Sequence, residues 1–182
     1  MTCQTGNNLL GWILPQNKHV EIVGKVAIML EIKIYSVEMQ QDIEHFYEKC
    51  FNDLGWGYEP TGRHSDIVNI PDIYMLNGCM WCMYENNQLI GTVAVRTIDK
   101  ENKIVEMKRL YVLKEQQGKG YGNMLFETAL NYVKEHRFNK ICADTRNDRN
   151  ASQHLMRKYG FNEVPRYNDN QFAELFFELN LV

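Results

Sequence analysis

The sequence lacks any apolar run long enough to cross a membrane. Its two most apolar stretches, residues 9–14 and 20–30, are interrupted by Gly, Glu or Lys, and the first ends at Pro15. A membrane-spanning helix needs roughly 20 consecutive apolar residues. The amino terminus also lacks the pattern of a secretory signal. We therefore predict no membrane partner.

A large excess of one charge is also missing. The chain has 20 Lys and Arg against 23 Asp and Glu, which gives a formal net charge of −3. Proteins that bind nucleic acids usually present a broad basic surface, and nothing in this balance implies one. We predict no nucleic-acid partner.

Cysteines are few, odd in number and irregularly spaced. The 5 cysteines do not form a disulfide framework, so a cytoplasmic location is expected. Cys79 and Cys82 have the spacing of a redox or zinc motif. They open a predicted strand, however, where positions three apart point to opposite faces, and no second Cys or His pair accompanies them. We expect no metal site.

The chain has 182 residues, of which 45% are apolar, and this suits one domain with a real core. Residues 1–27 are difficult to assign, because they are mostly polar and include a turn at residues 15–18. They are compatible with a disordered leader, a cloning remnant or an added strand. We treat residues 1–27 as a leader or extension of unknown role, and residues 28–182 as the functional domain.

The hydrophobic periods predict the elements of that domain. Alternation predicts a strand near residues 28–35, and helical spacing predicts a helix at 40–51. Residues 52–71 have no lasting period, so they predict a loop-rich connection that carries substrate contacts. Further strands are expected at 80–84, 89–97, 103–112, 140–144, 161–164 and 173–179, with helices at 120–136 and 151–159.

The links between the central strands are short, which makes the strands antiparallel neighbours. The element order predicts an α/β fold: one domain with a mixed, mostly antiparallel sheet of about seven strands, flanked by helices on both faces.

The strongest functional signal is the glycine-rich run Gln117–Gly122, between a predicted strand and a predicted helix. Alternating glycines remove side chains where the backbone must approach a ligand. Successive amide groups and the helix amino terminus then offer donors to an anion. The run predicts a cradle for the pyrophosphate of a coenzyme.

Two other phosphate-binding loops fit less well. A nucleotide-triphosphatase loop needs Ser or Thr after Gly-Lys, and Gly120 stands there. A dinucleotide fingerprint needs a third glycine where Asn123 stands. Asp144 ends the next strand at a distance suited to a ribose, so a nicotinamide-dependent oxidoreductase is an alternative. The antiparallel strands before the loop argue against it, because that fold opens with parallel units.

Three segments resemble the GNAT superfamily of N-acetyltransferases. Glu106–Val112 is similar to the family's fourth strand. Gln117–Gly122 matches its coenzyme loop, written Gln/Arg-x-x-Gly-x-Gly/Ala. Arg149–Phe161 resembles its second coenzyme-side helix. The resemblance implies the GNAT fold, and an N-acetyltransferase domain at residues 28–182.

The resemblance also implies that acetyl-coenzyme A is the co-substrate and that a primary amine of a small molecule or peptide accepts the acetyl group. A non-catalytic module that binds acyl-coenzyme A is the alternative, and a homodimer is implied by the resemblance alone. The implied coenzyme contacts are Leu110, Tyr111 and Val112 at a bulged strand, Gln117, Gly118, Lys119, Gly120, Tyr121 and Gly122 at the pyrophosphate, and Arg149, Asn150 and Ser152 on the second helix.

Two residues depart from the family pattern. Arg149 stands where the family often has Asn, with Asn150 one step later. Met156 stands where the family often has a Tyr that protonates the leaving thiolate, and methionine cannot donate a proton. The general acid is therefore unassigned, and solvent can serve.

The amine must be neutral to attack a thioester, so a general base helps. Glu106 is the candidate catalytic base, acting through a water; the alternatives are a solvated strand carboxylate or an ion-pair partner of Lys108 or Arg109. A backbone amide near Leu110 is a candidate donor to the oxyanion.

The predicted substrate loop adds further candidates. Glu59, Asp66 and Asp72 would form an acidic cleft suited to a polycationic acceptor. His64 is a candidate acceptor contact, or simply a solvated loop residue.

Overall fold

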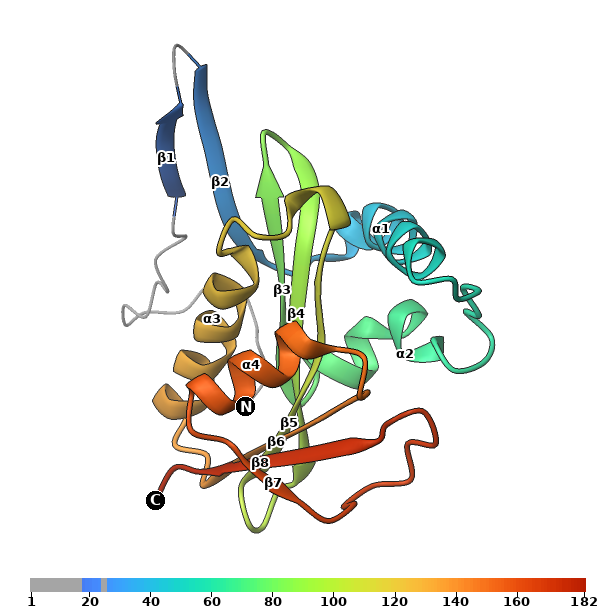
Figure 1. Cartoon of the computed structure of the whole chain (residues 1–182), viewed down its shortest axis with the longest axis vertical. Helices are drawn as coiled ribbons and strands as arrows, with labels where there is room; N and C mark the ends of the chain where they lie inside the picture. The colour runs from blue at the N-terminus through green and yellow to red at the C-terminus, as the bar shows by residue number, and fades with distance from the viewer. Residues whose placement is uncertain (1–17, 24–25) are drawn as a thin grey trace.

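The computed structural model describes residues 18–23 and 26–182. Within them, eight strands form one sheet in the order β1-β2-β3-β4-β5-β6-β8-β7 (Figure 1). The strands are β1 (Lys18–Val23), β2 (Val26–Ile34), β3 (Gly78–Glu85), β4 (Gln88–Asp99), β5 (Ile104–Val112), β6 (Lys140–Thr145), β7 (Asn162–Val164) and β8 (Leu175–Asn180). Among the described pairs, only β5 and β6 run parallel. The predicted mixed, mostly antiparallel α/β sheet is confirmed, with β1 as an added edge strand.

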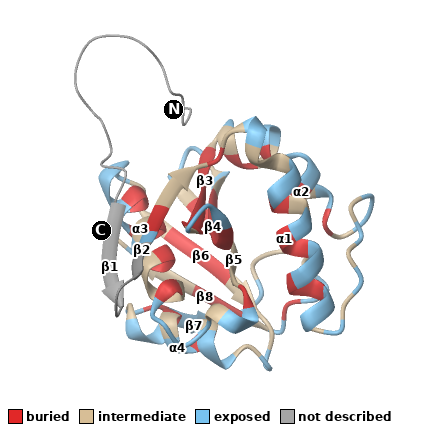
Figure 2. Ribbon diagram, turned by 90° about the horizontal axis from the view of Figure 1, so that it is seen from above, coloured by how far each residue is buried: buried red, intermediate tan, exposed pale blue. Residues whose placement is uncertain are grey.

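The helices cover both faces of this sheet, as predicted. They are α1 (Gln40–Asp53), α2 (Ser65–Val68), α3 (Tyr121–Glu135) and α4 (Asn150–Lys158), with short helical turns at Val37–Met39, Pro71–Met75 and Lys114–Gln116. Figures 1 and 2 show α1 and α2 on one side of the central strands and α3 and α4 on the other.

Helical spacing of apolar residues explains how α1 and α3 bind the sheet. Ile43, Tyr47 and Phe51 of α1 are fully buried, as are Leu125 and Ala129 of α3. These positions recur every four residues, so they lie along one face of each helix. The same pattern that predicted the two helices therefore supplies their contacts with the sheet.

The hairpin between β3 and β4 follows from its turn residues. Asn86 and Asn87 have φ angles of 49° and 67°, in the left-handed region that asparagine tolerates better than most residues. The predicted turn at residues 85–88 thus joins the strands tightly.

The sheet divides at β5, and this division creates the site. β5 pairs with β6 only from Ile104 to Met107. Just beyond, Lys108 and Tyr111 lie opposite Ala94 and Thr92 of β4, so β5 carries an extra residue at Arg109–Leu110. Arg109 has a φ of 55°. A bulge of this kind bends the strand, and here β5 separates from β6.

Candidate active site

A cleft of about 1200 Å³ occupies the gap that opens where β5 and β6 separate. It is larger than ordinary ligand pockets of roughly 300–1,000 Å³, so it has room for two substrates. Eleven of the twelve residues that the resemblance assigned to the coenzyme line it: Leu110, Tyr111, Val112, Gln117, Gly118, Gly120, Tyr121, Gly122, Arg149, Asn150 and Ser152. Residues far apart in the sequence therefore meet at one cavity.

The twelfth residue, Lys119, does not line the cleft. Its ammonium lies 2.5 Å from the side-chain oxygen of Gln116 and 3.9 Å from the Glu85 carboxylate. It adds a positive charge beside the loop and lies 5.7 Å from the centre of the Tyr121 ring.

The glycine loop has the geometry of an anion cradle. Gly118 and Gly120 have φ angles of 81° and 84°, a backbone conformation that L-residues rarely adopt. A Cβ at either position would find no atom within 4 Å, so the loop is open to a ligand. Within the described chain, the amide groups of Gly118, Lys119, Gly120 and Gly122 have no hydrogen-bond acceptor. These donors and the amino terminus of α3 converge on the same space.

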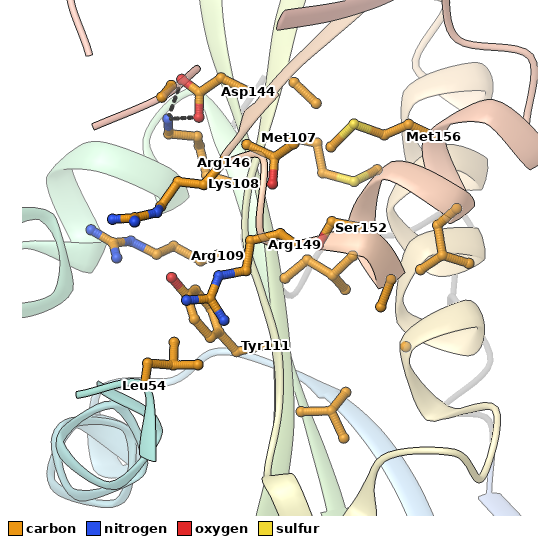
Figure 3. Close-up of a pocket in the computed structure, with 18 of the residues that line it drawn as sticks. Leu54, Met107, Lys108, Arg109, Tyr111, Asp144, Arg146, Arg149, Ser152 and Met156 are labelled. Carbon is orange, nitrogen blue, oxygen red and sulfur yellow. Dashed lines mark hydrogen bonds and ion pairs between the residues drawn. The ribbon is translucent and has the colours of Figure 1, made fainter. Parts of the chain in front are cut away.

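The two walls of the cleft differ in character. Figure 3 shows Ser152 and Met156 on the α4 side, whereas the guanidinium groups of Arg109 and Arg149 lie on the side of β5 that faces α1 and α2. Met156 is buried and lines the cleft with a thioether, which has no proton to give. We call the first wall the coenzyme side and the second the acceptor side.

Tyr159, the residue that caps the end of α4, does not line the cleft. Its ring stacks on Phe126 with centroids 4.9 Å apart, and its hydroxyl donates to the Asn123 side chain at 3.0 Å. Burial raises its pKa to about 12. These contacts connect α4 to α3.

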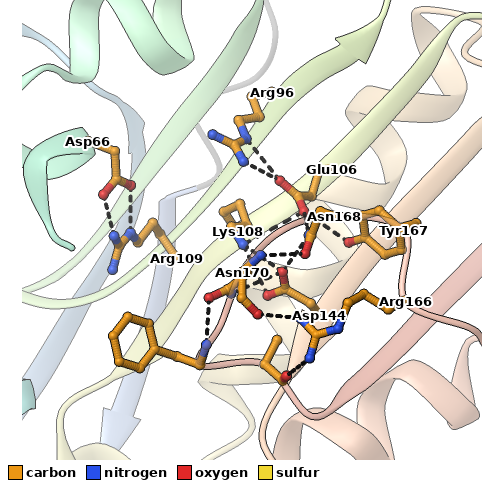
Figure 4. A network of polar contacts seen from close by, with 12 residues as sticks. Asp66, Arg96, Glu106, Lys108, Arg109, Asp144, Arg166, Tyr167, Asn168 and Asn170 are labelled. Carbon is orange, nitrogen blue, oxygen red and sulfur yellow. Dashed lines mark hydrogen bonds and ion pairs between the residues drawn. The ribbon is translucent and has the colours of Figure 1, made fainter.

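Glu106, the predicted base, does not line the cleft. It lies in a buried polar network (Figure 4). Its side chain is 1% exposed. Arg96 donates to one carboxylate oxygen at 2.7 and 2.9 Å, and Tyr167 and Asn168 donate to the other at 2.9 and 2.8 Å. A carboxylate has about four acceptor positions, and four donors occupy them here. The network crosses from β4 to the segment between β7 and β8.

Asp144, near the end of β6, lies beside this network and lines the cleft. Lys108 donates to both of its oxygens at 3.0 Å, and Asn168 and Asn170 donate at 2.8 and 3.2 Å. Burial acts to raise the pKa of Asp144, but the Lys108 ammonium and the amide donors hold that pKa below its ordinary value. An already satisfied carboxylate is poorly suited to hold the ribose of a dinucleotide.

The bulge places a buried ion pair on the acceptor side. Arg109 forms two hydrogen bonds with Asp66 of α2, one of them at 2.7 Å, and Tyr74 also donates to Asp66. Burial acts to raise the pKa of Asp66, but the guanidinium lowers it overall. One carboxylate of the predicted acidic cleft is therefore neutralised, and Glu59 lies 3.7 Å from Arg63.

His64 is not a solvated loop residue. It is 4% exposed and stacks on Phe51 with ring centroids 4.0 Å apart. Its Nδ1 accepts a hydrogen bond from the Glu59 amide at 2.9 Å. Burial and the neighbouring Arg109 lower its pKa to about 4. His64 is thus a neutral ring in the wall of the cleft.

Sequence reasoning named Arg149 only as a coenzyme contact, and it did not find the group of cations around Trp56. Arg63, Arg146 and Arg149 all lie over its indole and all line the cleft. They come from two separate loops, and no local motif connects them.

Comparisons with known proteins agree with this geometry. The profile of the "Acetyltransferase (GNAT) family" matches residues 37–161, more than half of the chain. The chain therefore belongs to this family. Within the described residues, no helix is both long and apolar enough to cross a membrane.

Curated relatives and solved structures are similar at low identity. "Probable N-acetyltransferase camello" of Xenopus tropicalis is 24% identical over 53% of this chain and 45% of its own length. "N-acetylaspartate synthetase" of the same organism is 26% identical over 63% of this chain and 46% of its own length. The chain thus spans about half the length of the curated relatives that it matches.

A GNAT acetyltransferase structure from Staphylococcus aureus Mu50 superposes with a TM-score of 0.76 at 20% identity, covering 84% of this chain and 99% of that one. A GNAT structure from Brucella melitensis, solved in complex with acetyl-CoA, has a TM-score of 0.62 at 16% identity and covers 84% of this chain and 88% of that one. These likenesses support the GNAT fold.

Proposed function

We propose that this protein transfers the acetyl group of acetyl-coenzyme A directly to a primary amine of a small molecule or peptide. The observation that carries the proposal is the cleft at the split between β5 and β6, with an open glycine cradle at one end and a polar chamber beyond the bulge. The names of two curated relatives, a probable N-acetyltransferase and an N-acetylaspartate synthetase, also support the proposal.

The cradle suits the pyrophosphate of the coenzyme. The amides of Gly118, Gly120 and Gly122 supply donors without side chains, and the α3 dipole adds partial positive charge. From there the pantetheine arm would follow Leu110–Val112 toward the bulge. The exposed edge of β5, which β6 leaves after Met107, offers backbone groups to that arm.

The chemistry is a direct displacement. The neutral amine nitrogen attacks the acetyl carbonyl carbon, a C–N bond forms, the C–S bond breaks and coenzyme A leaves as a thiolate. Near neutral pH the acceptor starts as an ammonium and loses two protons: one passes to solvent before the attack, and the other ends on the coenzyme A thiolate to give the free thiol. The tetrahedral oxyanion needs a preorganised donor, and an amide at the bulge near Leu110 is our candidate.

The base of the reaction stays a prediction. Four donors already occupy the Glu106 carboxylate, and it does not line the cleft. These contacts favour a positioning role, in which Glu106 holds Arg96 and Asn168 in place. Water in the chamber would then remove the amine proton.

Two measurements test the function. Acetyl-coenzyme A at 100 times its Kd should raise the free energy of unfolding by about 2.7 kcal/mol, while NAD should leave it unchanged. Thiol release with a broad amine panel should then reveal turnover. Stabilisation by NAD alone would contradict the proposal and support the oxidoreductase. Stabilisation by acetyl-coenzyme A without thiol release would support the non-catalytic module.

A further inference from the structure

A cluster of cations faces the acceptor side of the cleft; we call Trp56, Arg63, Arg146 and Arg149 the Trp56 cluster. The guanidinium carbons of the three arginines lie 5.5, 5.0 and 4.7 Å from the centre of the indole ring. Trp56 and Arg63 come from the connection between α1 and α2. Arg146 and Arg149 come from the loop between β6 and α4. All four residues line the cleft.

The positive charge of this cluster is poorly compensated. Asp148 lies 3.3 Å from the Nε atoms of Arg146 and Arg149, and Glu59 lies 3.7 Å from the Nε of Arg63. These carboxylates are 54% and 56% exposed, so water screens them strongly. Three guanidinium groups thus share two solvated carboxylates.

Several donors of the cluster are also unused. The Nε atoms of Arg63 and Arg149 are buried and make no hydrogen bond. In the part of the chain that the structure describes, the terminal nitrogens of Arg146 and Arg149 have no acceptor either. Buried donors normally have partners, so the two buried Nε atoms point to an acceptor that a ligand would supply.

The other cations of the cleft are paired with carboxylates that are largely buried. Arg109, Lys108 and Arg96 each pair with a carboxylate that is 18%, 7% or 1% exposed. Each of those pairs connects secondary-structure elements and is complete without a ligand. The Trp56 cluster differs because its arginines reach the cleft with donors to spare.

The position of the cluster points to the acceptor and not to the coenzyme phosphates. Figure 3 shows the guanidinium groups of Arg146 and Arg149 on the side of β5 that faces α1 and α2. The cradle for the pyrophosphate is formed by the glycine loop at the start of α3. The ligand that reaches the cluster is therefore expected to enter from the acceptor side.

We propose that the Trp56 cluster binds a carboxylate of the acceptor, so that the acetylated amine belongs to an amino acid or another small aminocarboxylate. This inference rests on the proposed transferase function. Guanidinium groups pair with carboxylates through two parallel hydrogen bonds. The three guanidinium groups stack on the indole of Trp56, which holds them in place. Phe172, whose ring centre is 5.2 Å from the Arg63 guanidinium, extends the same wall of the cleft. The cleft as a whole is lined by six cations and four carboxylates, which disfavours a polycationic acceptor.

The test compares amino acids with their own primary amides. Thiol release from acetyl-coenzyme A is measured with the full chain at pH 7.5 for the standard amino acids and the matching amides. The α-amine of an amide is the weaker base, so more of it is neutral and chemistry alone favours the amide. The wild-type protein should nevertheless prefer the acid by about tenfold or more in kcat/KM.

The arginine variants assign that preference. Arg63→Gln and Arg146→Gln should raise the acceptor KM and bring the acid-to-amide ratio toward one, while the KM for acetyl-coenzyme A stays unchanged. Arg157→Gln is the matched control, because Arg157 lies on α4 outside the cleft with a 54% exposed side chain. It should keep the wild-type ratio. Melting temperatures establish that each variant is folded.

Three results would overturn the inference. One is equal or better turnover of amides or polyamines. The second is a rise in the KM for acetyl-coenzyme A with an unchanged acceptor KM, which would assign the cluster to the coenzyme. The third concerns binding. If no amine is turned over, the proposed function is contradicted, and the carboxylate site is tested by the thermal stabilisation that amino acids and their amides give to the complex with coenzyme A. Equal stabilisation by acids and amides would reject the carboxylate site.

Discussion

Among single residues, Gly120 tests the proposal that the loop of residues 117–122 binds the coenzyme. Its φ of 84° suits glycine, and a Cβ would project into open space within the cleft. We predict that Gly120→Val abolishes the stabilisation by acetyl-coenzyme A, because the side chain fills the anion cradle. Backbone strain should cost about 1–2 kcal/mol of stability, measured by urea unfolding.

Gly160 provides the matched control for this change. It has the same φ of 84°, follows α4 and does not line the cleft. Gly160→Val should lose a similar amount of stability yet retain coenzyme affinity in calorimetry. Retained affinity in Gly120→Val would instead mean that the loop is not the cradle.

Glu106 tests whether a buried carboxylate acts as a base or as a scaffold. We predict that Glu106→Gln lowers kcat and stability but leaves the shape of the pH–rate profile unchanged. The reason is that the change deprives Arg96 of its ion pair, which should cost about 2–3 kcal/mol of stability. Profiles of kcat/KM from pH 6 to 10 check this, with Tyr167→Phe as a control that removes one hydrogen bond without altering charge. A loss confined to low pH would instead restore Glu106 as the base.

At the scale of elements, the connection between α1 and α2 contains His64, a buried histidine that should make the stability of the protein depend on pH. The pKa of His64 falls from 6.5 to about 4 on folding, because burial penalises the cation. Between these values the unfolded chain binds a proton that the folded protein does not. The His64 contribution to stability is therefore complete above pH 6.5 and is lost as the pH falls toward 4. We predict a loss of about 2 kcal/mol in the free energy of unfolding between pH 7.5 and 4.5.

Variants isolate this effect. His64→Phe keeps the stacking on Phe51 but cannot titrate, so its stability should vary less over this range. His45→Gln changes an exposed histidine of α1 and should behave like the wild type. Asp66 and Asp144, whose pKa values are lowered from 3.8, lose their contributions only in more acidic solution. An unchanged slope in His64→Phe would contradict the assignment.

Elements with strong local periods could be predicted from the sequence, whereas contacts between distant segments could not. The helix expected at 120–136 is found at Tyr121–Glu135, and the strand expected at 103–112 at Ile104–Val112. The position of Glu106 beneath the cleft depends on the segment after β7, which has no pattern of its own. The Trp56 cluster likewise needs two loops to meet, and loop conformation is determined by tertiary packing.

At the scale of the whole molecule, the proposed coenzyme site lies where one of the shorter strand pairings of the sheet ends. β5 and β6 pair through only four residue pairs, from Ile104–Lys140 to Met107–Ala143. The lining of the cleft comes from β5 and the glycine loop that follows it, and from α4, which follows β6. A ligand that contacts both the glycine loop and the amino terminus of α4 would add to the contacts that Asn123 makes with Lys158 and Tyr159.

We therefore predict that acetyl-coenzyme A slows amide hydrogen exchange most in α4 and in the loop of residues 117–122. Amides that exchange by local opening of the cleft should slow by about tenfold or more at saturating ligand, because each opening must first release the coenzyme. The tight turn at Asn86–Asn87 does not line the cleft and should be unaffected, and NAD should protect neither region. Exchange followed by mass spectrometry distinguishes these regions. Protection in the loop without protection in α4 would show that the ligand does not bridge the split.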